Sequence, residues 1–240
     1  MLKPETQALW NTLKDAQGLR GFVLIGGTAL AMHLQHRVSE DLDFAWLETK
    51  LPRTRIEAIK RFLETQGHRV MPNDSPAAIN EFEDSGLDLY DYQQDFIVDE
   101  AVKLTFVAID QELIKQMRAA NPDHVRVAAV DEIFRLKCIA CANRSKTRDW
   151  FDIYTLFERG LFQPIDMIEP FERLFGPSKL DIALTRMCSA RPEKTDEGYL
   201  QLTSDAPTLA TMQKRFEAAR EEIEVELARR TAKDSRSDRG

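Results

Sequence analysis

The chain has 240 residues, of which 43% are hydrophobic and 30% charged, so it can form one large globular domain or two small ones. Its net charge of -7 excludes tight, non-specific binding of nucleic acid by the whole surface. No apolar run is long enough to cross a bilayer, and MLKPETQALWNTLKD lacks the layout of a signal peptide, so we expect a cytoplasmic protein with no membrane partner.

Predicted helices and strands alternate in the first part of the chain. Residues 4–17 have apolar residues at helical spacing, and FVLI at 22–25 is typical of a strand buried on both faces. A glycine pair follows, and TALAMHLQ then predicts a helix. DLDFAWL at 41–47 begins with alternating acidic and apolar residues, which indicates a strand with one exposed face. Another helix is predicted over 54–67.

Residues 87–109 have β character. LDLYDYQQDFIV and AVKLTFVAI are two predicted strands, and the dipeptide at 99–100 between them predicts a tight turn and an antiparallel hairpin. The order β-α-β-α-β-β predicts a mixed sheet with packed helices, an α/β (α+β) domain over residues 1–112.

The second half is predicted to be an α-helical domain over residues 113–230. Helices are expected at 130–143, at 147–160 and over a long charged segment at 206–230, and the polar tail 231–240 is expected to be disordered. Cys138 and Cys141 form a C-x-x-C on one helical face, where burial is a better interpretation than zinc or redox chemistry, because no second ligand pair has suitable spacing.

Two features of the first domain indicate a site. A strand that ends at Gly26–Gly27 and runs into a helix exposes backbone N–H groups that favour a phosphate, although the pattern is neither a P-loop nor G-x-G-x-x-G. Asp41 and Asp43 would share one strand face, where two carboxylates suit Mg²⁺ or Mn²⁺. Arg37 and Ser39 could touch the phosphates, and a solvated strand end is the competing interpretation.

The segment GGTALAMHLQHRVSEDLDF resembles the signature of the DNA polymerase β-like nucleotidyltransferase superfamily, and most closely that of the AbiEii/AbiGii toxin family. Downstream, LKCIACANRSKTRDWFDIYTL is similar to a helical segment of the same family. The two matches occur in the expected order between about residues 22 and 156.

The resemblance implies a mixed-sheet nucleotidyltransferase-fold domain and a helical domain that completes the active-site cleft. It implies metal ligands at Asp41 and Asp43, and nucleotide-binding or catalytic roles for Gly26, Gly27, Thr28, Arg37, Ser39, Lys137 and Asp149. Lys137 would approach the nucleotide phosphates and Asp149 would activate an acceptor, with a solvated lysine and a helix cap as the alternatives. Asp152 is expected in a salt bridge with Arg148 or Arg144.

By resemblance, the protein is a metal-dependent nucleotidyltransferase. It would use a nucleoside triphosphate and Mg²⁺ to modify an RNA such as tRNA, or a protein, as the toxin half of a toxin–antitoxin or abortive-infection system with a cognate antitoxin.

One residue departs from the family pattern. Thr105 occupies the strand position where active members commonly have a third carboxylate, and spacing does not choose a substitute among Asp88, Asp91, Asp99 and Asp110. The alternative is therefore a catalytically degenerate fold that binds a nucleotide, RNA or a protein.

Overall fold

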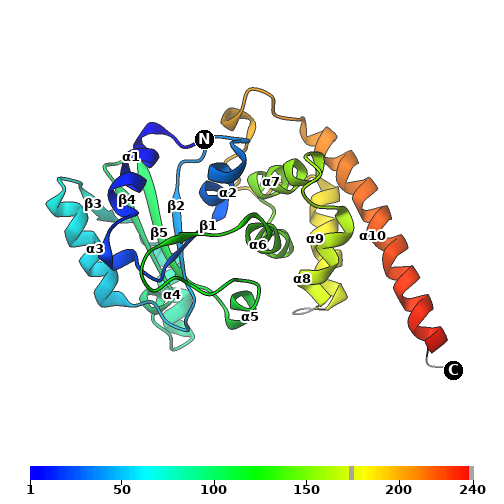
Figure 1. Ribbon diagram of the computed structural model, residues 1–240, viewed down its shortest axis with the longest axis horizontal. Helices are drawn as coiled ribbons and strands as arrows, with labels where there is room; N and C mark the ends of the chain where they lie inside the picture. The colour runs from blue at the N-terminus through cyan, green and yellow to red at the C-terminus, as the bar shows by residue number, and fades with distance from the viewer. Residues whose placement is uncertain (173–175, 238–240) are drawn as a thin grey trace. The chain divides into compact units, whose positions relative to one another are not determined.

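A six-stranded mixed sheet organises the first half of the chain in the computed structural model, which describes residues 1–172 and 176–237 (Figure 1). The strands are β1 (Val23–Ile25), β2 (Leu42–Trp46), β3 (Val70–Pro72), β4 (Gln93–Val98), β5 (Val102–Ala108) and β6 (Arg126–Val127). They lie in the order β3-β4-β5-β2-β1-β6. β2 is parallel to β5 and antiparallel to β1, so the predicted mixed sheet is confirmed.

Helices connect these strands. They are α1 (Pro4–Leu13), α2 (Gly26–Leu34), α3 (Arg53–Thr65), α4 (Pro76–Asp84) and α5 (Gln111–Ile114), with 3₁₀ turns at Gln17–Leu19 and Leu89–Asp91. α2 follows β1 as predicted, but it begins at Gly26 and includes the glycine pair, two residues before the predicted start at Thr28. The compact unit that contains the sheet extends to Ile133, beyond the boundary predicted at residue 112, because β6 pairs with β1.

One face of the sheet is covered by aromatic packing. Phe44 on β2 and Phe106 on β5 are paired residues whose ring centroids lie 5.7 Å apart, and Trp10 of α1 stacks on Phe44 at 6.3 Å. Phe44 and Phe106 are fully buried, and each contributes roughly 2 kcal/mol to folding. Because side chains alternate along a strand, Asp43 and Thr105 lie on the opposite face.

The β4–β5 hairpin has a three-residue loop. Val98 pairs with Val102, which leaves Asp99, Glu100 and Ala101 in the connection. Asp99 and Glu100 both have positive φ, 52° and 60°. The antiparallel pair is confirmed, and the loop length sets which residue of β4 faces each residue of β5.

The second compact unit begins at Phe134 and is helical. Its elements are the greater part of α6 (Val130–Asn143), then α7 (Thr147–Glu158), α8 (Ile168–Glu172), α9 (Pro177–Ser189) and α10 (Leu209–Ser237), with 3₁₀ turns at Pro164–Met167 and Leu200–Leu202. α9 and α10 run side by side, and α10 also contacts α7 (Figure 1). Trp150 and Phe216 are completely or almost completely buried and mark the core of this unit.

Several elements differ from the sequence prediction. β3, α4 and β6 were not expected, and the first part of the predicted strand at 87–98 is a 3₁₀ turn. α10 continues to Ser237, where the sequence predicts a disordered tail from residue 231, and the last three residues of that tail lie outside the described residues. In the described part of the chain, no helix is long and apolar enough to cross a membrane.

Candidate functional site

The polar face of the sheet brings three side chains into one row. Asp43 on β2 pairs with Ile25 of β1 on one side and with Thr105 of β5 on the other. Thr105 in turn pairs with Asp95 of β4. Paired residues of adjacent strands project to the same face, so Asp43, Thr105 and Asp95 lie next to one another across three strands.

Asp43 also lies against the glycine turn. Gly26 has φ +74°, and a Cβ built on it would fall 2.6 Å from Asp43 Oδ2. The glycine is therefore required both by its backbone conformation and by the approach of the carboxylate. Gly26 is the first residue of α2, where backbone N–H groups lack partners within the helix. A carboxylate and a helix N-terminus thus meet at one point.

The segment before β2 is anchored to α2 by buried polar contacts. Thr28 Oγ1 is 2.8 Å from Ser39 Oγ and also donates to the Asp41 carbonyl oxygen. The Arg37 guanidinium lies where Gly27 would carry a side chain. Thr28, Arg37 and Ser39 are all buried, and Thr28 joins the start of α2 to both Ser39 and Asp41.

Asp41 and Asp43 suit a divalent cation whose remaining ligands come from a substrate. Asp41 and Asp43 are half-buried, and among the described residues no three Asp, Glu, His or Cys side chains gather closely enough to hold a metal ion. Mg²⁺ is commonly held by one or two carboxylates together with substrate phosphates and water. Nearby, Thr105 Oγ1 and Asp95 Oδ1 are buried oxygens with no hydrogen-bond partner among the described residues. The donor set therefore fits a hard cation.

None of the four aspartates that could replace the third carboxylate is a strand partner of Thr105. Asp110 is exposed and precedes α5. Asp88, Asp91 and Asp99 lie in ion pairs elsewhere in the first unit, with partners that include Arg53, Lys50 and His68. The carboxylate beside Thr105 is that of Asp95, which the sequence analysis did not consider.

The second unit contains a separate buried charge cluster. Lys137 Nζ on α6 lies 2.5 Å from Asp149 Oδ1 and 2.9 Å from Asp152 Oδ2, both on α7. Arg144 Nε lies 2.7 Å from Asp149 Oδ2. Burial alone would raise the pKa of Asp149, but the charges of Lys137 and Arg144 hold that pKa below its ordinary value. The Asp149 carboxylate is therefore ionised, and each of its two oxygens is paired with a basic side chain.

The burial and contacts of this cluster bear on the environments expected for Lys137, Asp149 and Asp152. Lys137 is 7% exposed, so it is not a solvated helix residue. Asp149 makes charge pairs and does not cap α7. Asp152 on α7, whose expected partners were Arg148 or Arg144, lies 2.9 Å from Lys137 Nζ on the facing helix α6 through its Oδ2.

An acidic segment covers the start of α7. Asp196 Oδ1 accepts from the Thr147 backbone N–H at 2.9 Å, and Asp196 Oδ2 accepts from Thr147 Oγ1 at 2.7 Å, so a distant aspartate caps the helix. The basic residues around it are also paired, Lys146 with Glu193 and Arg148 with Glu197. The basic side chains of the segment RSKTRD, residues 144–149, are thus paired with carboxylates within this unit.

The C-x-x-C sequence has no access to solvent. Cys138 and Cys141 are both fully buried and carry free thiols. Burial raises the pKa of each thiol well above its ordinary value, which disfavours the thiolate that zinc or redox chemistry needs. The interpretation as packed small side chains is confirmed.

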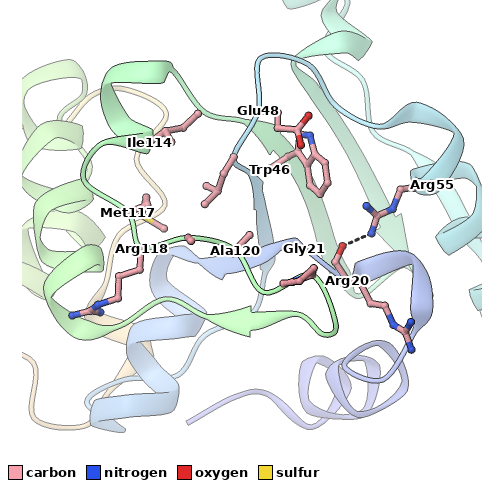
Figure 2. Close-up of a pocket in the computed structure, with 12 residues that line it drawn as sticks. Arg20, Gly21, Trp46, Glu48, Arg55, Ile114, Met117, Arg118 and Ala120 are labelled. Atoms are coloured by element: carbon pink, nitrogen blue, oxygen red, sulfur yellow. Dashed lines mark hydrogen bonds between the residues drawn. The ribbon is translucent and has the colours of Figure 1, made fainter.

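A cavity of about 440 Å³ lies at the opposite end of the β1–β2 pair from Gly26. Figure 2 shows Trp46, Arg55, Ile114 and Met117 around it. Arg55 stacks on the Trp46 ring with its Cζ 5.1 Å from the centroid. Asp41 and Asp43 are not among the residues that line this cavity, so volume alone does not locate the acidic site.

The mixed sheet, the glycine pair at the start of α2, and Asp43 on β2 with Asp41 just before it agree with the nucleotidyltransferase resemblance noted in the sequence. The chain belongs to the family described as "Nucleotidyl transferase AbiEii toxin, Type IV TA system", whose model matches residues 7–235. The resemblance inferred from two sequence segments is confirmed over nearly the whole chain.

Solved structures that match this chain include JHP933 from Helicobacter pylori, with 19% identity, coverage of 98% of this chain and 100% of that chain, and a TM-score of 0.49. MenT4, a nucleotidyltransferase toxin from Mycobacterium tuberculosis, is 16% identical over 87% of this chain and 77% of its own, with a TM-score of 0.46. A search of curated proteins gives no match.

Proposed function

We propose that this protein transfers a nucleoside monophosphate from a nucleoside triphosphate to an RNA or protein acceptor, with Mg²⁺ or Mn²⁺, in the cytoplasm. The observation that carries the proposal is the contact between Asp43 and Gly26, since it joins a metal-binding carboxylate to a phosphate-binding helix start.

The residues around this contact have distinct proposed roles. Asp41 and Asp43 hold the cation, and the backbone at Gly26 and Gly27 receives the phosphates. Arg37, whose guanidinium lies at Gly27, adds positive charge at the same turn. When bound, the cation neutralises the triphosphate and orients it.

Chemically, the acceptor oxygen attacks the α-phosphorus and forms a new P–O bond. The bond between the α-phosphorus and the bridging oxygen breaks, and pyrophosphate leaves with the electron pair. Asp149 is proposed to receive the acceptor proton and Lys137 to approach the phosphates. The family match over residues 7–235 includes both positions, which supports this assignment.

Membership of a type IV toxin family supports a toxin that is controlled by a cognate antitoxin. The acceptor is proposed to be an RNA such as tRNA, or a protein.

The second candidate function is binding without transfer. Thr105 favours it, because the position beside Asp43 lacks a carboxylate. In that case the protein binds a nucleotide, RNA or a protein as a catalytically degenerate module. Thermal shift with each of ATP, GTP, CTP and UTP would then show Mg²⁺-dependent binding, while no acceptor is labelled.

Label transfer tests the proposal. The protein is incubated with Mg²⁺, total RNA or lysate, and each triphosphate labelled at the α-phosphate or, separately, at the γ-phosphate. We expect α-label alone to enter an acceptor, and Asp41→Ala to abolish transfer, while the exposed Asp15→Ala serves as the control. Transfer that survives Asp41→Ala would refute this site.

A further inference from the structure

The polar face of the sheet also contains a lysine. Lys103 precedes Leu104 on β5, and Asp41 precedes Leu42 on β2; since Leu42 and Leu104 are paired, Lys103 lies level with Asp41. Lys103 and Thr105 are two residues apart, so both project to the face that carries Asp43. Three carboxylates and one ammonium group therefore share this face.

Lys103 is bound to the carboxylate farthest from the glycine turn. Its Nζ lies 3.1 Å from Asp95 Oδ2, which also accepts from Gln93 Nε2 at 3.1 Å. The Asp95 side chain is 13% exposed and that of Lys103 is 40% exposed. Burial alone would lower the pKa of Lys103. The negative charges of Asp95 and, to a smaller extent, of Asp43 and Asp41 raise it, so the ammonium group interacts electrostatically with all three carboxylates.

The space between Asp95 and Asp43 contains unsatisfied oxygens. Thr105, which pairs with both, is 9% exposed, and its Oγ1 has no hydrogen-bond partner among the described residues. Asp95 Oδ1 has none within the same part of the chain. A buried polar atom without a partner is costly, so these two oxygens indicate a place that the water of a nearby cation fills.

We propose that Lys103 is a resident counter-ion of this acidic face, and that Asp95 positions it away from the Asp41–Asp43 pair so that a divalent cation can bind there. The inference rests on the proposed function, because it needs a cation at Asp41 and Asp43. Lys103 and Asp95 are positioning residues and do not ligate the metal.

The proposal predicts opposite effects on Mn²⁺ binding for substitutions at Lys103 and at Asp95. Lys103→Met removes a positive charge beside the metal site, so Mn²⁺ binding becomes about 3- to 10-fold tighter. Asp95→Asn releases the ammonium toward Asp41 and Asp43, so binding weakens by about threefold or more. In the Lys103→Met background, Asp95→Asn weakens binding by less than about twofold, because Asp95 acts through the lysine.

The experiment titrates the full-length protein with MnCl₂ alone and counts free Mn²⁺ by electron paramagnetic resonance at low ionic strength. The variants are Lys103→Met, Asp95→Asn, their double variant and Asp43→Asn, each checked by its thermal unfolding midpoint. Lys103→Arg should restore wild-type affinity. Lys115→Met removes an exposed charge directly after α5 in the same unit and should change nothing.

The results separate two failures. Wild-type Mn²⁺ binding that Asp43→Asn does not weaken would overturn the proposed function, and this inference with it. Binding that depends on Asp43 but is unchanged by Lys103→Met would overturn this inference alone. So would an equal loss from Asp95→Asn in both backgrounds, because Asp95 would then be a ligand in its own right.

Discussion

The Asp43 carboxylate occupies the space in which any side chain at residue 26 would lie, 2.6 Å from the position of a Cβ on Gly26. Gly26→Ala must therefore displace Asp43 and also adopt φ +74°, a conformation that costs an alanine about 1 to 3 kcal/mol. We expect this variant to be destabilised in urea and to lose Mn²⁺ and nucleotide binding.

Gly67→Ala is the matched control for that variant. Gly67 has φ +89°, but no atom lies within 4 Å of the Cβ position, so its substitution carries the backbone cost without a clash. It should lose stability and keep ligand binding. If Gly26→Ala binds Mn²⁺ as well as Gly67→Ala does, the contact with Asp43 has no functional role.

The Lys137–Asp149 pair predicts a pH-dependent contribution to stability. Asp149→Asn leaves a buried lysine with one fewer charge partner, and should cost roughly 3 kcal/mol at neutral pH. Because the folded-state pKa of Asp149 is lowered, its contribution is fully present above the unfolded value of about 3.9 and is lost as pH falls through the folded value. Urea unfolding at several pH values measures both effects.

The control for this pair is an exposed one. Asp181 Oδ1 lies 2.7 Å from Arg220 Nη2, with 63% of the Asp181 side chain exposed. Asp181→Asn should cost about 1 kcal/mol or less. Equal losses from the two substitutions would mean that burial does not strengthen the Lys137–Asp149 pair.

Within residues 1–172 and 176–237 the Thr105 hydroxyl has no hydrogen-bond partner, which makes its removal favourable. Thr105→Val keeps the shape of the side chain and replaces the buried Oγ1 with a methyl group. Because this oxygen has no hydrogen-bond partner in the described part of the chain, the free energy of unfolding should rise by up to about 1 kcal/mol. Metal-free protein is the relevant sample. Destabilisation by this substitution would show that the hydroxyl is hydrogen-bonded in solution.

Asp196 caps α7 from a distance in sequence. Asp196→Ala removes acceptors for the Thr147 N–H and hydroxyl groups and should destabilise the protein by about 1 to 2 kcal/mol. Glu197→Ala, which removes a more exposed partner of Arg148, should cost about 1 kcal/mol or less. A larger loss from Glu197→Ala would place the stabilising interaction at Arg148.

Local pattern predicted much of this fold, because FVLI, the glycine pair and the DLDF alternation each specify their own element. β3 and β6 were missed since VMP and RV are too short to show alternation, and their strand character comes from pairing with β4 and β1.

Asp95 was missed for a different reason, namely the length of one loop. A two-residue turn at Asp99–Glu100 would place Gln94 opposite Thr105, whereas the three-residue loop places Asp95 there. The residue types of Asp99 and Glu100 do not predict the positive φ angles that set this register. Likewise, the pairing of Lys137 with Asp152 depends on how α6 packs against α7.

The measurement that tests the central claim most directly is backbone cleavage by Fe²⁺ substituted for Mg²⁺. Bound Fe²⁺ with ascorbate and peroxide produces hydroxyl radicals that cut the chain near the metal. We predict fragments that end near Gly26 and near Asp41–Asp43, competed by excess Mg²⁺ and absent from the Asp41→Asn, Asp43→Asn double variant. Cleavage elsewhere, or cleavage at these positions that persists in the double variant, would contradict a cation site at Asp41 and Asp43.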